Sequence, residues 1–158
     1  MSWWIVGTGG YARKAFDAVV ARGEQVSGFI DENPDAISPV DSLPVFIPGA
    51  WPSSMNVERA FVAIGRPEVR RRLMDKLCVD GVQLPPLIHP RAWVAPDAIL
   101  GEGCFVGAQA AVESAAIVGR GCIVDTGSVV DHDARLDDYL HLMPGSVARS
   151  GTHIVRDL

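Results

Sequence analysis

The sequence predicts a small α/β domain over residues 1–84, followed by a parallel β-helix over residues 85–158. Two observations support this prediction. A six-residue repeat runs from Ile88 onward, and a strand–helix–strand pattern with a glycine-rich turn precedes it. The two patterns have different hydrophobic periods, so we expect them to form separate domains.

The repeat is clearest at its first position, which is a branched aliphatic residue in eleven of twelve hexads. The fifth position is small in most hexads. One large and one small inward residue per hexad fits a prism with one hexad on each side. Three hexads make one coil, so Cys104 and Cys122 should stack on adjacent coils about 4.8 Å apart. The first-position residues are Ile88, Val94, Leu100, Val106, Val112, Val118, Val124, Val130, Leu136, Leu142, Ala148 and Ile154.

Before the repeat, apolar runs predict buried strands at residues 2–6, 26–30 and 60–64. Short links between strands and helices indicate a parallel sheet. The segment between the second and third strands is expected to be a loop because it is rich in proline. These prolines are Pro34, Pro39, Pro44, Pro48 and Pro52.

Two helices are predicted from the spacing of apolar residues. The first covers residues 11–22 and should end at Gly23, while the second begins at Pro67 and should end at Gly81. The inner face of the second helix is expected to consist of Val69, Leu73 and Leu77.

Composition excludes several classes of function. The formal net charge is -5 without a basic run, which argues against a nucleic-acid binder. No apolar stretch is long enough for a membrane span, and no signal peptide is apparent. Three cysteines without a framework spacing fit a reducing cytoplasm. The densest basic group, which we interpret as a solvated helix face, is Arg66, Arg70, Arg71 and Arg72.

The glycine turn after the first strand has a chemical interpretation. Glycines entering a helix present free backbone N–H groups and the positive end of the helix dipole, which suits a phosphate. Gly7, Gly9 and Ala12 match a dinucleotide pattern, and Asp31 stands where a ribose-binding acid is found. A plain turn without a ligand is the alternative. The domain is too short for a full dinucleotide fold, so a mononucleotide or nucleotide-sugar is favoured over NAD. An oxidoreductase that uses NAD is a further alternative.

Five segments resemble the bacterial nucleotide-sugar N-acetyltransferases and sialic acid O-acetyltransferase-like proteins. They are IVGTGGYARKAFDAV, VSGFIDENP, FVAIGRPEVRRRL, LPPLIHPRAWVAPDAILGEG and VDTGSVVDHDARLDDYLHLMPGS. The resemblance implies a left-handed β-helix, a homotrimer and acetyl-CoA as the acetyl donor. It implies a UDP- or GDP-linked amino sugar as acceptor, and it implies no metal.

The resemblance places the catalytic histidine at His132 and its orienting acid at Asp133. The residues themselves agree, because His132 is third in its hexad, at an outward turn between two aspartates. Such a histidine can act as a general base toward an amine or hydroxyl. A surface histidine in an acidic turn is the alternative. His132 and His141 are nine residues apart and so lie on different sides of one prism, which requires a neighbouring subunit to complete one site.

The remaining site residues are implied by the resemblance. The acetyl-CoA side is assigned to Asp125, His141 and Gly151. The nucleotide-sugar side is assigned to Gly7, Thr8, Gly9, Gly10, Tyr11, Asp31, Glu32, Ile64 and Gly65.

The sequence departs from the family pattern at three points. Tyr11 replaces a usual histidine near the sugar, and Asp125 replaces a frequent asparagine. The repeat forms only about four coils, roughly 19 Å of stack, where the family usually has more. A nucleotide-sugar-binding protein that has lost the acetyl-CoA site through a shortened β-helix is therefore an alternative to an active acetyltransferase.

Overall fold

The computed structural model describes residues 2–47 and 56–156. Pro48 and Pro52 of the expected loop lie outside these residues. The chain divides into two compact units between Pro85 and Pro86, one residue after the boundary expected from the sequence. Each unit is described by itself.

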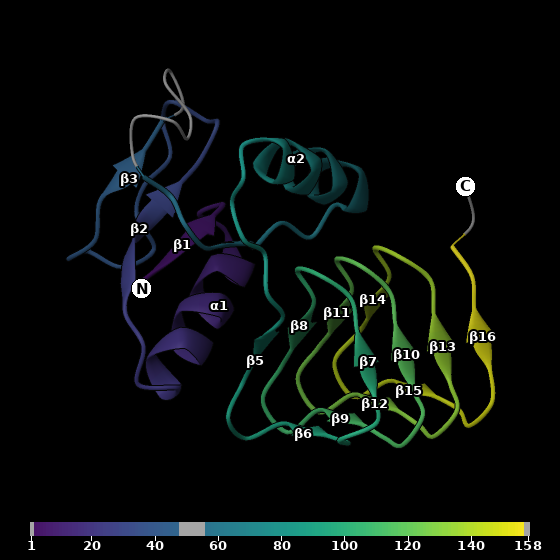
Figure 1. The fold of residues 1–158 in the computed structure, drawn as a ribbon. Coiled ribbons are helices and arrows are strands. Elements are labelled where there is room, and N and C mark those ends of the chain that lie inside the picture. Colours follow the sequence, from purple (N-terminus) through teal and green to yellow (C-terminus); the bar gives the residue numbers. More distant parts are fainter. Residues whose placement is uncertain (1, 48–55, 157–158) are drawn as a thin grey trace. The chain divides into compact units, whose positions relative to one another are not determined.

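The N-terminal unit is built on a parallel sheet with the strand order β3-β2-β1-β4 (Figure 1). Its strands are β1 (Trp3–Val6), β2 (Val26–Ile30), β3 (Val45–Phe46) and β4 (Ala60–Val62). The expected third strand ends two residues early, at Val62. The expectation of a plain proline-rich loop is wrong at β3, which pairs with the end of β2. This edge strand has only two residues beside Pro44, too few to show a strand pattern.

Helix α1 (Gly10–Ala21) links β1 to β2, and helix α2 (Pro67–Val79) follows β4. After α2 the chain returns to the far side of β4, where Gln83 forms a parallel bridge with Arg59. The two crossovers run in opposite directions from the middle of the sheet. Right-handed crossovers therefore place the two helices on opposite faces, with the strand order reversing between β1 and β4.

The inner face of α2 differs from the expected one. The buried residues are Arg70, Leu73, Met74 and Leu77, while Val69 is only half-buried. The expectation that Arg70 lies on a solvated face is wrong, because its side chain is buried. Arginine has no apolar signal, so the spacing of apolar residues pointed to Val69 instead of the neighbouring Arg70 as the buried residue.

The C-terminal unit is a parallel β-helix with three faces of four strands each (Figure 1). One face contains β5 (Leu87–Ile88), β8 (Phe105–Val106), β11 (Ile123–Val124) and β14 (His141–Leu142). The second contains β6 (Trp93–Val94), β9 (Ala111–Val112), β12 (Val129–Val130) and β15 (Val147–Ala148). The third contains β7 (Ile99–Leu100), β10 (Ile117–Val118), β13 (Arg135–Leu136) and β16 (His153–Ile154).

The register of these strands confirms the 18-residue coil. Val124 pairs with Val106 on one side and with Leu142 on the other. Cys104 and Cys122 are buried in the shared core, and the Cys104 thiol donates to the Gly119 carbonyl at 2.8 Å. The hydrogen bond with the Cys122 thiol and burial raise the pKa of the Cys104 thiol far above its ordinary range. These cysteines are therefore packing residues, as expected.

Two backbone features repeat along the β-helix. Glycine occupies the second hexad position at corners where adjacent coils approach closely. A Cβ on Gly101, for example, would lie 2.5 Å from the Arg120 backbone nitrogen. The fourth hexad position adopts a left-handed conformation from Gly103 to Gly151, with φ between 56° and 71°. Asp133 occupies one of these turn positions, with φ 59°.

Candidate functional site

The glycine turn of the N-terminal unit lies where the strand order reverses. Gly7 has φ 106°, and a Cβ there would lie 2.7 Å from Cδ1 of Ile64. The absence of a side chain therefore lets the segment after β4 approach the turn after β1. A Cβ on Gly65 would in turn lie 3.5 Å from the Tyr11 ring. The structure thus brings Gly7, Tyr11, Ile64 and Gly65 together, as the sequence-based site requires.

Thr8 connects the same turn to the end of β2. Its hydroxyl donates to the Asp31 carboxylate at 2.7 Å, and the Asn33 backbone N–H donates to the same carboxylate at 2.9 Å. Gly9 is the N-cap of α1 and provides no side-chain cap, and Gly10 is exposed. The N-terminus of α1 therefore offers backbone N–H groups and the positive end of the helix dipole beside a fixed carboxylate.

Arg70 is a site residue that the sequence did not reveal. Its guanidinium is buried and donates to the carbonyl oxygens of Ile64 and Gly65, at 2.7 and 2.9 Å. These are the two residues expected to line the nucleotide site. Arg70 thereby holds the segment after β4 in place.

Glu32 forms an ion pair within its own unit. Arg72 of α2 donates two hydrogen bonds to its carboxylate, at 2.9 and 2.6 Å. The Arg72 hydrogen bond lowers the pKa of Glu32, and the charges of Arg72 and Lys76 act in the same direction. The expected nucleotide contact of Glu32 is therefore occupied by an ion pair.

In the β-helix, His132 and Asp133 form a pair at the turn between β12 and β13. The Nδ1 atom of His132 lies 2.8 Å from Oδ2 of Asp133, and both side chains are well exposed. The Asp133 hydrogen bond raises the pKa of His132, and the charges of Asp131, Asp133 and Glu113 add to this effect. An aspartate that accepts from Nδ1–H leaves Nε2 free of a proton, which is the form a general base needs.

His141 and Asp125 form a second pair on the face of β5, β8, β11 and β14. The Nε2 atom of His141 lies 3.1 Å from Oδ2 of Asp125, whose side chain is fully buried. The backbone N–H of Thr126 donates to the other Asp125 oxygen at 2.7 Å. The resemblance-based pair of His141 and Asp125 is thus in contact, and its carboxylate is rigidly held.

Gly151 does not lie with His141. Its backbone N–H donates to the carbonyl of His132 at 3.1 Å, so it stacks on the His132 turn in the next coil. His132 stands at the corner between the second and third faces, whereas His141 is on the first face. One chain therefore presents the two histidines on different sides of the prism.

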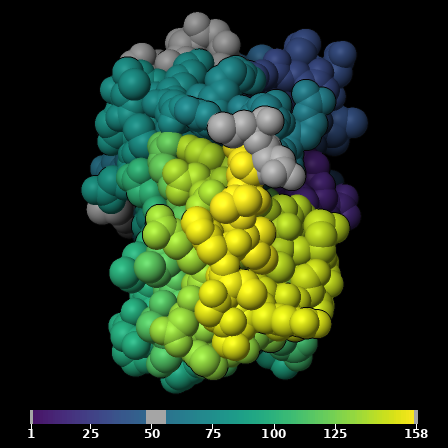
Figure 2. Space-filling view, turned by 90° about the vertical axis from the view of Figure 1, so that its right-hand side faces the viewer, coloured from purple at the N-terminus to yellow at the C-terminus, as the bar shows by residue number. Residues whose placement is uncertain are grey.

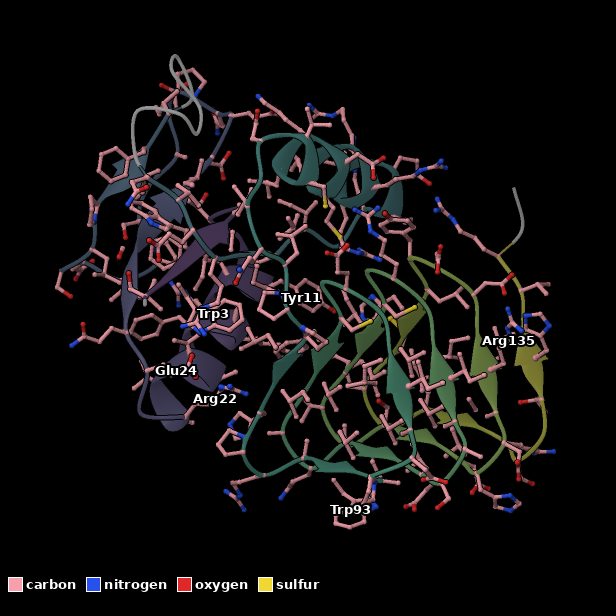
Figure 3. All side chains as sticks on the ribbon, in the orientation of Figure 1. Trp3, Tyr11, Arg22, Glu24, Trp93 and Arg135 are labelled. Carbon is pink, nitrogen blue, oxygen red and sulfur yellow. The ribbon has the colours of Figure 1, made fainter. Side chains whose placement is uncertain are left out.

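A third pair was not recognised in the sequence. Nε2 of His153 lies 2.6 Å from Oδ1 of Asp137, and both side chains are partly exposed. The pair occupies the same two hexad positions as His141 and Asp125, the sixth and the second. This recurrence of histidine and aspartate at the same hexad positions is the sequence signal that could have predicted the pair. Arg135, the strand neighbour of His153, lies on the same face (Figure 3).

Among residues 2–47 and 56–156, no three or more histidine, cysteine or acidic side chains are grouped to hold a metal ion. Within the same ranges, neither helix has the length and apolar character needed to cross a bilayer.

Comparisons with known proteins show which family the chain belongs to. The family model of the PglD N-terminal domain matches residues 4–77. A histidine-to-asparagine variant of perosamine N-acetyltransferase from Caulobacter crescentus, solved with CoA and GDP-perosamine, is 35% identical. The match has a TM-score of 0.90 and covers 97% of this chain and 73% of that one. The chain belongs to the hexapeptide-repeat nucleotide-sugar acetyltransferases. This assignment confirms the family, the enzyme class and the left-handed β-helix expected from the sequence.

Two other acetyltransferase structures extend the comparison. The acetyltransferase domain of PglB from Neisseria gonorrhoeae, in complex with acetyl coenzyme A, is 31% identical with a TM-score of 0.83. That match covers 92% of this chain and 72% of the other. WeeI from Acinetobacter baumannii AYE is 22% identical with a TM-score of 0.83. The match covers 97% of this chain and 74% of WeeI, and it supports the fold alone.

Replacement of Arg70 by methionine should destabilise the acetyltransferase by about 1–3 kcal/mol, because the carbonyl oxygens of Ile64 and Gly65 lose the hydrogen bonds of a buried guanidinium. Chemical denaturation of the full chain measures this loss. The matched control is Arg71→Met on the exposed side of the same helix, which should change stability by less than about 0.5 kcal/mol. Equal effects of the two substitutions would contradict a structural role for the Arg70 contacts.

Proposed function

We propose that this acetyltransferase moves the acetyl group of acetyl-CoA to the amine of a nucleotide-linked amino sugar, with His132 as the general base. The exposed His132–Asp133 pair, with Nδ1 and Oδ2 2.8 Å apart, is the observation that carries the proposal. The C. crescentus relative supports the substrate class, since it was solved with CoA and GDP-perosamine. A UDP-linked amino sugar has the same reacting group, so either nucleotide is compatible with this chemistry.

The chemistry follows from the tautomer. Asp133 accepts from Nδ1–H, so Nε2 of His132 accepts the proton that the sugar amine loses as its nitrogen attacks the thioester carbonyl. The carbon–sulfur bond then breaks, and the CoA thiolate recovers the proton from the imidazolium. A hydroxyl acceptor would follow the same sequence of proton transfers. Tyr11 cannot replace His132 as base, because a phenol stays protonated near neutral pH.

The N-terminal unit would hold the nucleotide. In this proposal the diphosphate lies against the turn of Gly7 to Gly10, at the N–H groups that follow Gly7, because the Gly7 N–H donates to the Ile30 carbonyl at 2.7 Å. Asp31 accepts from the ribose, and Ile64 and Gly65 line the nucleotide pocket. The contact between Thr8 and Asp31 supports this arrangement, because it orients the carboxylate beside the helix N-terminus. The sugar would then extend past Tyr11.

We also propose a homotrimer with each active site shared between two subunits. His132 and His141 lie on different sides of one prism, so the His141–Asp125 pair would come from a neighbouring copy to contact acetyl-CoA. The second face supports association, because its outward residues Trp93, Ala111, Val129 and Val147 are all uncharged. Trp93 is 56% exposed and points away from the β-helix (Figure 3). The three cysteines form no disulfide in the described part of the chain, which is compatible with the cytoplasm as the location.

His132→Ala should lower the rate of acetyl transfer about 10²- to 10⁴-fold, because the general base is lost. Release of the CoA thiol from acetyl-CoA, measured with GDP- and UDP-linked amino sugars, reports the rate. His153→Ala is the matched control, since it removes the histidine of another exposed His–Asp pair and should leave the rate unchanged. Undiminished activity of His132→Ala would refute the mechanism. A wild-type chain that binds the nucleotide-sugar but consumes no acetyl-CoA would instead be a binding protein.

Asp133→Asn should shift the acid limb of the pH–rate profile to lower pH and also reduce the plateau rate. Asp133 raises the pKa of His132, so the wild-type base is neutral only above that raised pKa. Removing the carboxylate lowers the pKa, so deprotonation occurs at lower pH, but the base is then weaker. An unmoved acid limb would show that a group other than His132 is titrating.

Mixed oligomers of His132→Ala and His141→Ala chains should regain activity that neither variant has alone. In a shared site, an intact His132 from one subunit can meet an intact His141 from its neighbour. Co-expression with two different affinity tags and purification through both isolates the mixed species. Absence of regained activity in a confirmed mixed oligomer would place both histidines in one subunit's site.

A further inference from the structure

The ion pair between Glu32 and Arg72 joins two flanks of the candidate nucleotide site. Glu32 immediately follows Asp31 at the end of β2, where Thr8 holds the Asp31 carboxylate. Arg72 is on α2, two residues beyond the Arg70 that holds Ile64 and Gly65. Because β1 lies between β2 and β4, the pair connects elements on either side of the strand that ends in the glycine turn. All these residues belong to the N-terminal unit.

The contact between Arg72 and Glu32 is bidentate, and a phosphate could accept it in the same way. The two terminal nitrogens of Arg72 each donate to a different Glu32 oxygen, at 2.9 and 2.6 Å. This parallel arrangement is available equally from a phosphate, whose oxygens match the same fork. A diphosphate also carries more negative charge than a carboxylate, so it is the stronger partner at the same site.

Arg72 can exchange Glu32 for another partner at little cost, because an exposed ion pair contributes little to stability. The side chain of Arg72 is 56% exposed and that of Glu32 is 42% exposed, so water and salt screen their attraction. Lys76, one helical turn after Arg72, also favours the charged form of Glu32. A second cation therefore remains close to Glu32 when Arg72 changes partner.

We propose that Arg72 binds a phosphate of the nucleotide-sugar in exchange for Glu32. In this exchange the guanidinium leaves the carboxylate and donates its two hydrogen bonds to the diphosphate held at the N-terminus of α1. This inference rests on the proposed nucleotide-sugar function and adds Arg72 to the binding residues.

The two partners of the pair give opposite results in a binding experiment. GDP and UDP are titrated calorimetrically into the full chain and its variants at low and high salt. Arg72→Gln should weaken binding about tenfold or more, because a bidentate charged contact to phosphate is lost. Glu32→Gln should leave diphosphate binding unchanged or strengthen it by up to about fivefold, because it removes the competitor for Arg72. The loss caused by Arg72→Gln should shrink at high salt.

Arg71→Gln is the matched control, because Arg71 precedes Arg72 on α2 and its one ion pair among the described residues is a long contact, 3.9 Å, to Asp75. It should bind GDP and UDP as the wild type does, and thermal unfolding should be equal for both arginine variants. Equal binding by Arg72→Gln and wild type would overturn the exchange and leave the proposed function standing. A similar loss in Glu32→Gln and Arg72→Gln would also overturn it, since the intact pair would then be the binding element. Failure of the wild type to bind either diphosphate would overturn the proposed function as well.

Discussion

The stacking of each inward aliphatic residue on its equivalent in the next coil is the constraint on which the turn of His132 and Asp133 depends. The core columns remain in register only if every coil has the same length, so the turn positions repeat with the core. The third hexad position is never buried in the described hexads, and the fourth is left-handed from Gly103 onward. His132 and Asp133 occupy these two positions in one hexad. The packing of buried valines thus exposes a histidine and turns an aspartate toward it.

The N-terminal unit obeys a different constraint. Its strand order reverses between β1 and β4, and the helices that follow these two strands leave on opposite faces. Gly7 brings the two strand ends close because it has no side chain to separate them. The buried Arg70 side chain then donates to the carbonyl oxygens of Ile64 and Gly65. The same residues that complete the fold therefore form the edge at which a nucleotide would bind.

Three histidine–aspartate pairs in one β-helix show how environment separates similar contacts. The His132 pair is on an exposed turn and can meet a substrate, whereas the His141 pair is anchored by a buried carboxylate. The His153 pair joins two adjacent coils, because Asp137 follows β13 and His153 is on β16. The yellow residues of the C-terminal coil face the viewer in Figure 2. Their distances differ by no more than 0.5 Å, from 2.6 to 3.1 Å. Exposure and anchoring, more than contact distance, distinguish the exposed His132 pair from the His141 pair with its buried carboxylate.

The sequence by itself determined the β-helix, its coil length, the stacked cysteines and the exposure of His132, because these follow from a short period repeated many times. It also located β1, β2 and the glycine turn, whose signals are local. The tertiary structure decided what depends on partners distant in sequence. It buried Arg70 against Ile64 and Gly65, paired Glu32 with Arg72, and placed Gly151 beside His132. Long charged side chains choose their partners by three-dimensional proximity after the backbone has folded, so no spacing along the chain encodes those contacts.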